Sequence, residues 1–307
     1  MQPEISVIIP VHNEELVLDA AYTRITASIK KISSNYELLF VNDGSKDKSI
    51  ELIKRFASID NNVKYIDLSR NFGHQIALSA GIDAALGNSV VIIDADLQDP
   101  PELIAELYNK LNEGFDVVYA KRRERKGERF LKKLVAKYFY RVFSKIIPFE
   151  IPIDTGDFRI LNKRIVEQLR QMPEQQRFLR AQIAWLGFNQ SFVEFDREPR
   201  YAGKGTYTYK KLWAMAVDGI TAFSSTPLKI ASNIGLCLLT ISVVLLGYLF
   251  FNWLETNQHP SSALLLLFAI LFIGSIQLIC LGIIGEYISR INTNVRNRPL
   301  YVVKQRN

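Results

Sequence analysis

The chain has 307 residues, and its 38 lysines and arginines outnumber its 31 aspartates and glutamates, which gives a net charge of +7. This excess is concentrated between Lys121 and Lys145, where no nucleic-acid-reading motif occurs, so we expect no nucleic-acid partner. The two cysteines, Cys237 and Cys280, lie inside long apolar runs, and the sequence therefore indicates no disulfide framework.

Strand and helix patterns alternate over roughly the first 120 residues. Short apolar, β-branched runs predict strands at 5–10, 37–41, 63–68, 90–93 and 116–119. Amphipathic patterns between them predict helices at 14–31, 46–58, 72–86 and 101–112. This alternation predicts an α/β domain in which a mostly parallel sheet is covered by helices on both faces.

Polar side chains follow the first two predicted strands. The first strand runs into His12, Asn13 and Glu14, and the second ends at Asp43. Neither a GxGxxG nor a GxxxxGK[ST] motif is present, so the usual phosphate loops of dinucleotide dehydrogenases and P-loop NTPases are missing. The two strand ends instead predict groups that hold a base and a ribose, because ligands of open α/β sheets bind outside the carboxyl ends of the strands.

An acidic cluster follows the buried run Val90–Ile93. Asp94, Asp96, Gln98 and Asp99 place three carboxylates and one amide within six positions. Such hard oxygen ligands suit Mg²⁺ or Mn²⁺, and these ions suit a nucleotide diphosphate. The alternative interpretation is a helix cap or a solvated turn, for which Pro100-Pro101 offers a helix start.

The basic stretch after the fifth strand has a helical pattern. From about residue 128 to 147, lysines and arginines alternate with aromatic and aliphatic side chains. A basic amphipathic helix suits an anionic membrane surface. The alternative is a helix packed on the domain core with a solvated basic face.

The last third of the chain contains two runs without a charged residue, at 230–253 and 263–285. Each is long enough to cross a hydrocarbon core as a helix, and nine residues separate them, which predicts a transmembrane hairpin. Two buried helices of a soluble protein are the alternative. The short connection has no lysine or arginine while both flanks are basic, so the positive-inside rule places both termini in the cytoplasm. Because the first residues lead directly into a strand-like run, we expect no signal peptide.

Five motifs carry a resemblance to a known family: PVHNEE, VNDGS, SRNFGHQIALSAGIDAA, DADLQD and DTGDFRIL. In order and spacing they resemble the family 2 glycosyltransferases of the GT-A fold. The similarity runs from Ile5 to Tyr207 and is strongest to the polyprenyl-phosphate hexose transferases, which include dolichol-phosphate mannose synthase and the bactoprenol glucosyltransferases. The resemblance implies a GT-A domain over residues 1–206. A juxtamembrane helix at 207–229, spans at 230–253 and 263–285 and a cytoplasmic tail at 286–307 complete the expected division.

The resemblance also implies roles for individual residues. The nucleotide-sugar set comprises Pro10, His12, Asn13, Glu14, Asp43, Asp94, Ala95, Arg200 and Lys204. The expected metal ligands are Asp94, Asp96 and Gln98, the expected acceptor-phosphate contacts are Lys121, Arg122 and Arg123, and the expected catalytic residues are Asp157, Asp96 and Arg122. Residues 200–207 depart from the family's R-x-x-G-x-S-K-Y, because Gly205-Thr206 replaces Ser-Lys; Lys204 is the candidate substitute.

The implied reaction is inverting, metal-dependent transfer of a hexose to a polyprenyl phosphate. The two-span architecture resembles that of the bactoprenol glucosyltransferases, and this resemblance favours glucose from UDP-glucose, with GDP-mannose, UDP-N-acetylglucosamine and UDP-aminoarabinose as alternatives. Because the second pKa of a phosphate monoester is about 6, the acceptor needs no strong base. We therefore interpret Asp157 first as an orienting group, second as a general base, and otherwise as a loop carboxylate.

Two other functions remain as hypotheses. A processive polysaccharide synthase would want a Gln-x-x-Arg-Trp motif, for which the nearest segment is Glu174–Phe178, and more spans. A catalytically idle membrane scaffold would not need the three metal ligands. Gly274, Gly282 and Gly285 allow close helix contact, so a homo-oligomer is a further expectation.

Overall fold

The computed structural model describes residues 2–123, 155–175, 177–196, 251 and 262–307. The basic helix expected at 128–147, the juxtamembrane helix at 207–229, Arg200 and Lys204 lie outside these residues. The described elements belong to two compact units: the first holds all eight strands, and the second holds the helix α10, Ser262–Val295.

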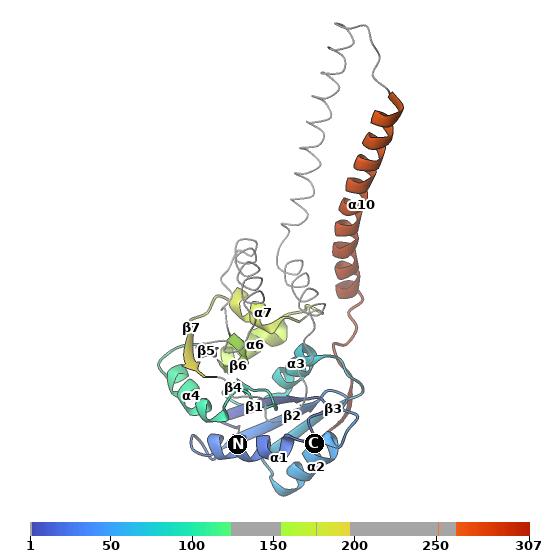
Figure 1. The fold of residues 1–307 in the computed structure, drawn as a ribbon. Coiled ribbons are helices and arrows are strands. Elements are labelled where there is room, and N and C mark those ends of the chain that lie inside the picture. The colour runs from blue at the N-terminus through green and yellow to red at the C-terminus, as the bar shows by residue number, and fades with distance from the viewer. Residues whose placement is uncertain (1, 124–154, 176, 197–250, 252–261) are drawn as a thin grey trace. The chain divides into compact units, whose positions relative to one another are not determined.

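The first unit is built on one eight-stranded sheet with the order β7-β5-β6-β4-β1-β2-β3-β8 (Figure 1). The strands are β1 (Ile5–Val11), β2 (Tyr36–Asn42), β3 (Val63–Leu68), β4 (Ser89–Ile92), β5 (Val117–Arg122), β6 (Thr155–Asn162), β7 (Gln190–Phe195) and β8 (Val303–Arg306). The core β4-β1-β2-β3 is parallel, whereas β6 is antiparallel to β4 and β5, and β8 is antiparallel to β3. The predicted α/β class with a mostly parallel sheet is therefore confirmed.

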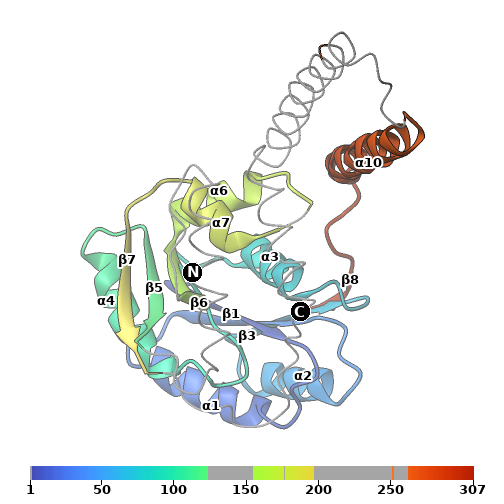
Figure 2. The ribbon, with the colours of Figure 1, turned by 45° about the horizontal axis from the view of Figure 1, so that its top comes forward.

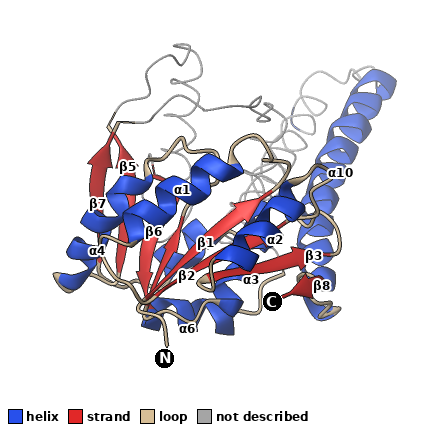
Figure 3. Cartoon of the chain, turned by 90° about the horizontal axis from the view of Figure 1, so that it is seen from below, coloured by secondary structure: helices blue, strands red, loops and turns tan. Residues whose placement is uncertain are grey.

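Helices cover both faces of the sheet (Figure 3). On one face α1 (Leu18–Ile29), α2 (Ser49–Ile59) and α4 (Ile104–Asn112, after the short η1, Pro101–Leu103) share a core with Val7 and Ile9 of β1. On the other face α3 (His74–Ala84), α6 (Lys163–Gln171) and α7 (Leu179–Trp185) share a core with Ile8. This alternation follows the period of two along a strand, and burial on both faces explains why β1 is apolar except for Ser6, which donates a hydrogen bond to Glu37.

The helix expected at 14–31 begins later, at Leu18. The backbone N–H groups of Glu14 and Glu15 donate to Ser49 Oγ (3.0 Å) and Asp47 Oδ2 (3.1 Å). These contacts hold Glu14 and Glu15 against the start of α2, and the residues that follow them form a turn before the helix begins.

The register brings the predicted site loops together at one edge of the sheet. Val11 of β1 pairs with Asn42 of β2, and Ile8 pairs with Ile92 of β4, so the loops after these strands lie beside one another. Leu97, between Asp96 and Gln98, has φ 55°. A left-handed backbone is uncommon for a residue other than glycine and is typical of strained functional loops.

Among the residues that the structure describes, we find no helix that combines the length and the apolar character needed to cross a membrane. The span expected at 263–285 is therefore not confirmed, and the span expected at 230–253 lies outside the described residues except for Phe251. Helix α10 itself continues past the expected end of that span to Val295.

The candidate active site

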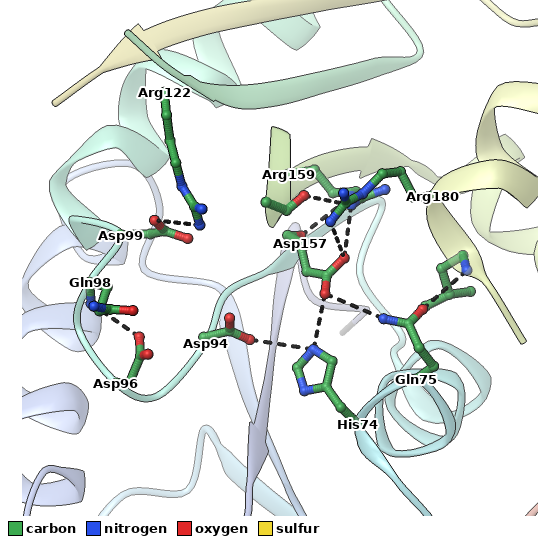
Figure 4. Close-up of polar contacts among 12 residues, drawn as sticks. His74, Gln75, Asp94, Asp96, Gln98, Asp99, Arg122, Asp157, Arg159 and Arg180 are labelled. Carbon is green, nitrogen blue, oxygen red and sulfur yellow. Dashed lines mark hydrogen bonds and ion pairs between the residues drawn. The ribbon is translucent and has the colours of Figure 1, made fainter. Parts of the chain in front are cut away.

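The acidic cluster lies in the loop that follows β4 (Figure 4). Asp96 is 8% exposed, and its Oδ1 accepts a hydrogen bond from the backbone N–H of Gln98 at 3.1 Å. The side chain of Asp94 is 34% exposed, but its Oδ1 is buried and accepts no hydrogen bond from the described residues. A buried carboxylate oxygen without a donor is costly, which suggests that the site is built to receive a positive group.

Asp157, on β6, is surrounded by donors from two helices, α3 and α7, and from its own strand (Figure 4). His74 Nε2 lies 3.1 Å from Oδ2 of Asp157, and Gln75 Nε2 donates to the same oxygen at 3.3 Å. On the other side, Nη2 of Arg159 and of Arg180 lie 3.1 and 3.6 Å from Oδ1. His74 also reaches Asp94 Oδ1 at 3.6 Å, so one imidazole nitrogen joins the acidic loop to Asp157.

These contacts shift the pKa values of Asp157 and Asp94 in opposite directions. Burial raises the pKa of Asp157, but the hydrogen bond from His74 and the charges of Arg180 and Arg159 hold it well below its ordinary value. Burial raises the pKa of Asp94, and despite the nearby His74 the charges of Asp157, Asp96 and Asp99 help to bring it to about 6. Asp157 is thus anionic and weakly basic at neutral pH.

Burial also lowers the pKa of His74, but its hydrogen bond to Asp157 and the charges of Asp94, Asp157 and Asp43 outweigh this and raise the pKa to about 9. His74 is therefore an imidazolium at neutral pH. A cation shared by Asp94 and Asp157 offsets part of their mutual repulsion.

The acidic loop fits a divalent cation that is also held by substrate. The part of the chain that the structure describes contains no group of three or more histidine, cysteine or acidic side chains arranged to hold a metal ion. Mg²⁺ commonly takes one or two carboxylates and completes its shell with water and substrate phosphates. Asp94, Asp96 and Gln98 of this loop offer ligands of that chemistry, and Oδ1 of Asp94 accepts no hydrogen bond from the described residues.

The structure separates the three residues expected to meet the acceptor phosphate. Arg122 Nη2 lies 3.5 Å from Oδ1 of the buried Asp99, and its Nε is buried without an acceptor among the described residues. Lys121 and Arg123 instead face Glu194 of β7, at 3.3 and 3.8 Å. Successive side chains of a strand point to opposite faces, which explains why Arg122 alone turns toward the acidic loop.

The predicted nucleoside residues line the ends of β1 and β2. His12 Nδ1 lies 2.8 Å from the carbonyl oxygen of Asp43, and Asn13 Oδ1 accepts from the backbone N–H of Lys46 at 2.8 Å. Pro10 is buried in β1, and Ala95 is buried in the acidic loop. Asp43 is also buried, and its two oxygens accept from the backbone N–H groups of Phe72 (2.7 Å) and Gly73 (3.0 Å).

Four residues of this site were not predicted: His74, Gln75, Arg159 and Arg180. Arg159 could have been recognised from the sequence, because this charged residue interrupts an apolar strand between Phe158 and Ile160. In the structure its side chain is only 1% exposed. His74 and Gln75 lie within SRNFGHQ, a motif that carried the family resemblance without any role for these two residues. Arg180 comes from α7, and no local pattern links it to Asp157.

Comparisons with known proteins identify the family of the chain. Residues 6–170 match the family described as Glycosyl transferase family 2, and residues 226–291 match the GtrB C-terminal hairpin. The uncharacterized glycosyltransferase YkcC of Bacillus subtilis is 46% identical over 98% of this chain and 93% of its own length. The bactoprenol glucosyl transferase of Shigella phage SfII is 38% identical over 98% of both chains.

One solved structure supports the fold alone. Glucosyl-3-phosphoglycerate synthase of Mycobacterium tuberculosis, in complex with phosphoglyceric acid, superposes with a TM-score of 0.50 at 19% identity. The superposition covers 72% of this chain and 78% of the synthase.

Proposed function

The chain belongs to the family 2 glycosyltransferases, and we propose that it transfers glucose from UDP-glucose to a polyprenyl phosphate with inversion at the anomeric carbon. The choice of glucose and of a polyprenyl acceptor is supported by the 38% identical relative, whose name is bactoprenol glucosyl transferase and whose length is covered almost completely. GDP-mannose, UDP-N-acetylglucosamine and UDP-aminoarabinose are the alternative donors.

The mechanistic part of the proposal depends on one observation, the lowered pKa of Asp157. Asp157, the candidate base, is surrounded by His74, Arg159 and Arg180, which keep its pKa well below the ordinary value. Such a carboxylate is poorly suited to remove a proton from a sugar hydroxyl, but a phosphate acceptor is already largely dianionic at neutral pH. The site therefore suits a phosphate acceptor better than a hydroxyl acceptor.

In the proposed reaction, an acceptor phosphate oxygen attacks the anomeric carbon while the bond from that carbon to the nucleotide diphosphate breaks on the opposite face. Arg122, with its buried Nε unused among the described residues, binds the acceptor phosphate, to which a guanidinium is well matched. Asp157 orients His74, Arg159 and Arg180 around the reacting groups. No proton needs to move when the attacking phosphate is a dianion.

We assign a divalent cation, Mg²⁺ or Mn²⁺, to Asp94, Asp96 and Gln98, because the buried Oδ1 of Asp94 accepts no hydrogen bond from the described residues and has His74 only at 3.6 Å. When bound, such a cation neutralises the charge that develops on the departing diphosphate. The nucleoside side of the proposed site is then formed by Pro10, His12, Asn13, Glu14 and Ala95. Asp43 supports that side by holding the backbone of Phe72 and Gly73.

The proposal also includes a membrane location. The match to the GtrB C-terminal hairpin at 226–291 and the uncharged runs at 230–253 and 263–285 support two spans with both termini in the cytoplasm. A polyprenyl phosphate resides in the bilayer, so an enzyme that uses it must work at the membrane surface. The expected homo-oligomer stays a prediction.

The test is incorporation of radiolabelled sugar into chloroform-soluble lipid by membranes that contain the full chain. We expect label from UDP-glucose when undecaprenyl phosphate is supplied, loss of the reaction in EDTA, and its return with Mg²⁺ or Mn²⁺. The variant Asp96→Ala in the same membranes serves as the control for other enzymes. If label is incorporated from a different donor, glucose is not the sugar that the enzyme transfers. Full activity in the presence of EDTA would show that the reaction needs no divalent metal.

A further inference from the structure

The last residues of the chain return to the first unit and complete its sheet. Strand β8 pairs antiparallel with β3, with Gln305 opposite Asp67 and Val303 opposite Leu68 (Figure 2). Asn307 closes the far end: its Oδ1 accepts from the backbone N–H of Tyr65 at 2.7 Å. Thus a segment that follows α10 in the sequence is an integral strand of the domain that carries the candidate active site.

Side chains attach this tail, which we define as residues 299–307, to two helices. Tyr301 donates its hydroxyl hydrogen to Asp83 Oδ2 of α3 at 2.9 Å, and its ring packs on the core beneath α3. Lys54 of α2 donates to Gln305 Oε1 at 2.8 Å. The tail therefore holds β3 and α3, the elements on either side of one loop.

That loop, residues 69–73, is central to the candidate site. Its first residue donates to the tail, from the backbone N–H of Ser69 to the carbonyl of Val302 at 2.9 Å. The side-chain amide of Asn71 lies 3.1 Å from His12, and the backbone N–H groups of Phe72 and Gly73 bind Asp43. Directly after it comes His74, which joins Asp94 to Asp157.

The loop is also fitted closely against the end of β2. A Cβ added at Gly44 would lie 2.4 Å from backbone atoms of Arg70 and Asn71. This close packing prevents the loop from moving toward Gly44, whereas movement away from Gly44 is limited by the attachments at the two ends of the loop. One end is fixed by the first turn of α3 and the other by the tail.

We propose that the tail is a positioning element of the nucleotide site. By fixing the start of loop 69–73, the tail sets the placement of Asp43 and His74. The catalytic domain is therefore complete only when the chain has continued through its C-terminal hairpin. The assignment of the pocket to a nucleotide rests on the proposed function. The placement of the loop by the tail does not. The simpler alternative is that β8 only covers the exposed edge of β3 against aggregation.

The test compares three full-length or nearly full-length proteins in membranes or detergent. One ends after Leu300, one carries Tyr301→Phe, and the control carries Lys304→Ala at an exposed position of β8. Amide hydrogen exchange of the peptide that contains Phe72 and Gly73 is followed without any substrate. Loss of one supporting hydrogen bond changes the equilibrium constant for local opening by about fivefold. We therefore expect amide exchange to be at least about fivefold faster in the truncated protein, with a smaller increase in Tyr301→Phe.

Binding and kinetics provide the second measurement. The truncated protein should bind UDP about fivefold more weakly and show a raised KM for UDP-glucose with a smaller change in kcat. A synthetic peptide of residues 301–307, added to the truncated protein, should restore both the exchange protection and the affinity, as strand addition does at open sheet edges. Lys304→Ala should match the wild type in every measurement.

Wild-type exchange in the truncated protein would overturn the proposal and leave β8 as an edge cover. So would faster exchange spread evenly over the whole domain that the peptide does not reverse. If the wild-type protein binds no UDP, the proposed function fails, but the exchange experiment still decides whether the tail places the loop.

Discussion

At the scale of single residues, Asp157 shows how neighbours decide the chemistry of a carboxylate. Three cationic groups, His74, Arg159 and Arg180, lie within 3.6 Å of its oxygens, and they keep it ionised. Asp94, in contrast, has a pKa raised to about 6 and an oxygen without a donor among the described residues. Two aspartates joined by one imidazole are thus prepared for different tasks, one as a fixed anion and one as a ligand for incoming positive charge.

The variant Asp157→Asn tests this division. If Asp157 orients its neighbours and removes no proton, the variant should retain transfer within about a hundredfold of the wild type, whereas loss of a true general base costs about two to four orders of magnitude. The amide leaves Arg159 without its anionic partner, so we also expect a lower free energy of unfolding, by up to about 3 kcal/mol. Activity must therefore be measured well below the melting temperature. A loss above a thousandfold with normal donor binding would identify Asp157 as the base.

His74 gives a prediction about pH. Its folded pKa is raised above the ordinary 6.5 to about 9, so it binds its proton more tightly in the folded protein than in the unfolded chain. The stability it contributes is then fully present below pH 6.5 and is lost as the pH rises through about 9. Thermal unfolding of wild type and His74→Gln from pH 6 to 10 should show a difference that is largest at pH 6 and disappears near pH 10. A constant difference across this range would contradict the assignment.

At the scale of elements, strand alternation separates neighbouring cations. Arg122 turns toward Asp99, whereas Lys121 and Arg123 turn toward Glu194 of β7. We expect Arg122→Ala to lower kcat/KM for the lipid phosphate at least about tenfold, because a charge-assisted contact to phosphate is lost.

Arg123→Ala is the matched control, since it removes the same charge one position along the chain. It should change kcat/KM by less than about twofold, because an exposed ion pair contributes little. Equal losses in both variants would show that the acceptor meets the whole basic segment, and the separation by strand faces would then be irrelevant to binding.

The elements also show which parts of the fold the sequence predicts. The first five strands are marked by apolar runs that are buried on both faces, and β1 to β4 follow these runs to within one or two residues. The position of β6 between β4 and β5 is decided by pairing partners far away in the sequence, which no local pattern reveals. Strand β8 reads Val-Lys-Gln-Arg and is exposed along its whole length, so it carries no strand signal at all.

The same distinction holds for the site. The acidic loop and the ends of β1 and β2 were predictable, because polar residues directly follow apolar strands there. Arg180 of α7 and His74 of α3 reach Asp157 from helices on the same face of the sheet, and such convergence is a property of packing. A sequence shows which residues have suitable chemistry, while the fold decides which of them meet.

At the scale of the whole molecule, the order of segments along the chain links the active site to the proposed membrane hairpin. The catalytic domain takes seven strands from the part of the chain before residues 226–291, which match the hairpin, and one from the part after them. If both ends of the hairpin connect to one domain, both must lie on the same side of the bilayer. An even number of spans satisfies this condition, in agreement with two uncharged runs.

This topology predicts the labelling of introduced cysteines. In a background with Cys237 and Cys280 replaced by serine, a cysteine at Asn257 lies between the two proposed spans, and one at Lys304 lies on β8 of the catalytic domain. An impermeant thiol reagent applied to intact cells should label the first directly and the second only after lysis, because basic flanks stay in the cytoplasm. Lipid-linked sugar formation by both variants would show that the substitutions leave the enzyme assembled. Labelling of both positions only after lysis would mean that the hairpin does not cross the membrane, and the proposed location would then have to rest on surface attachment instead.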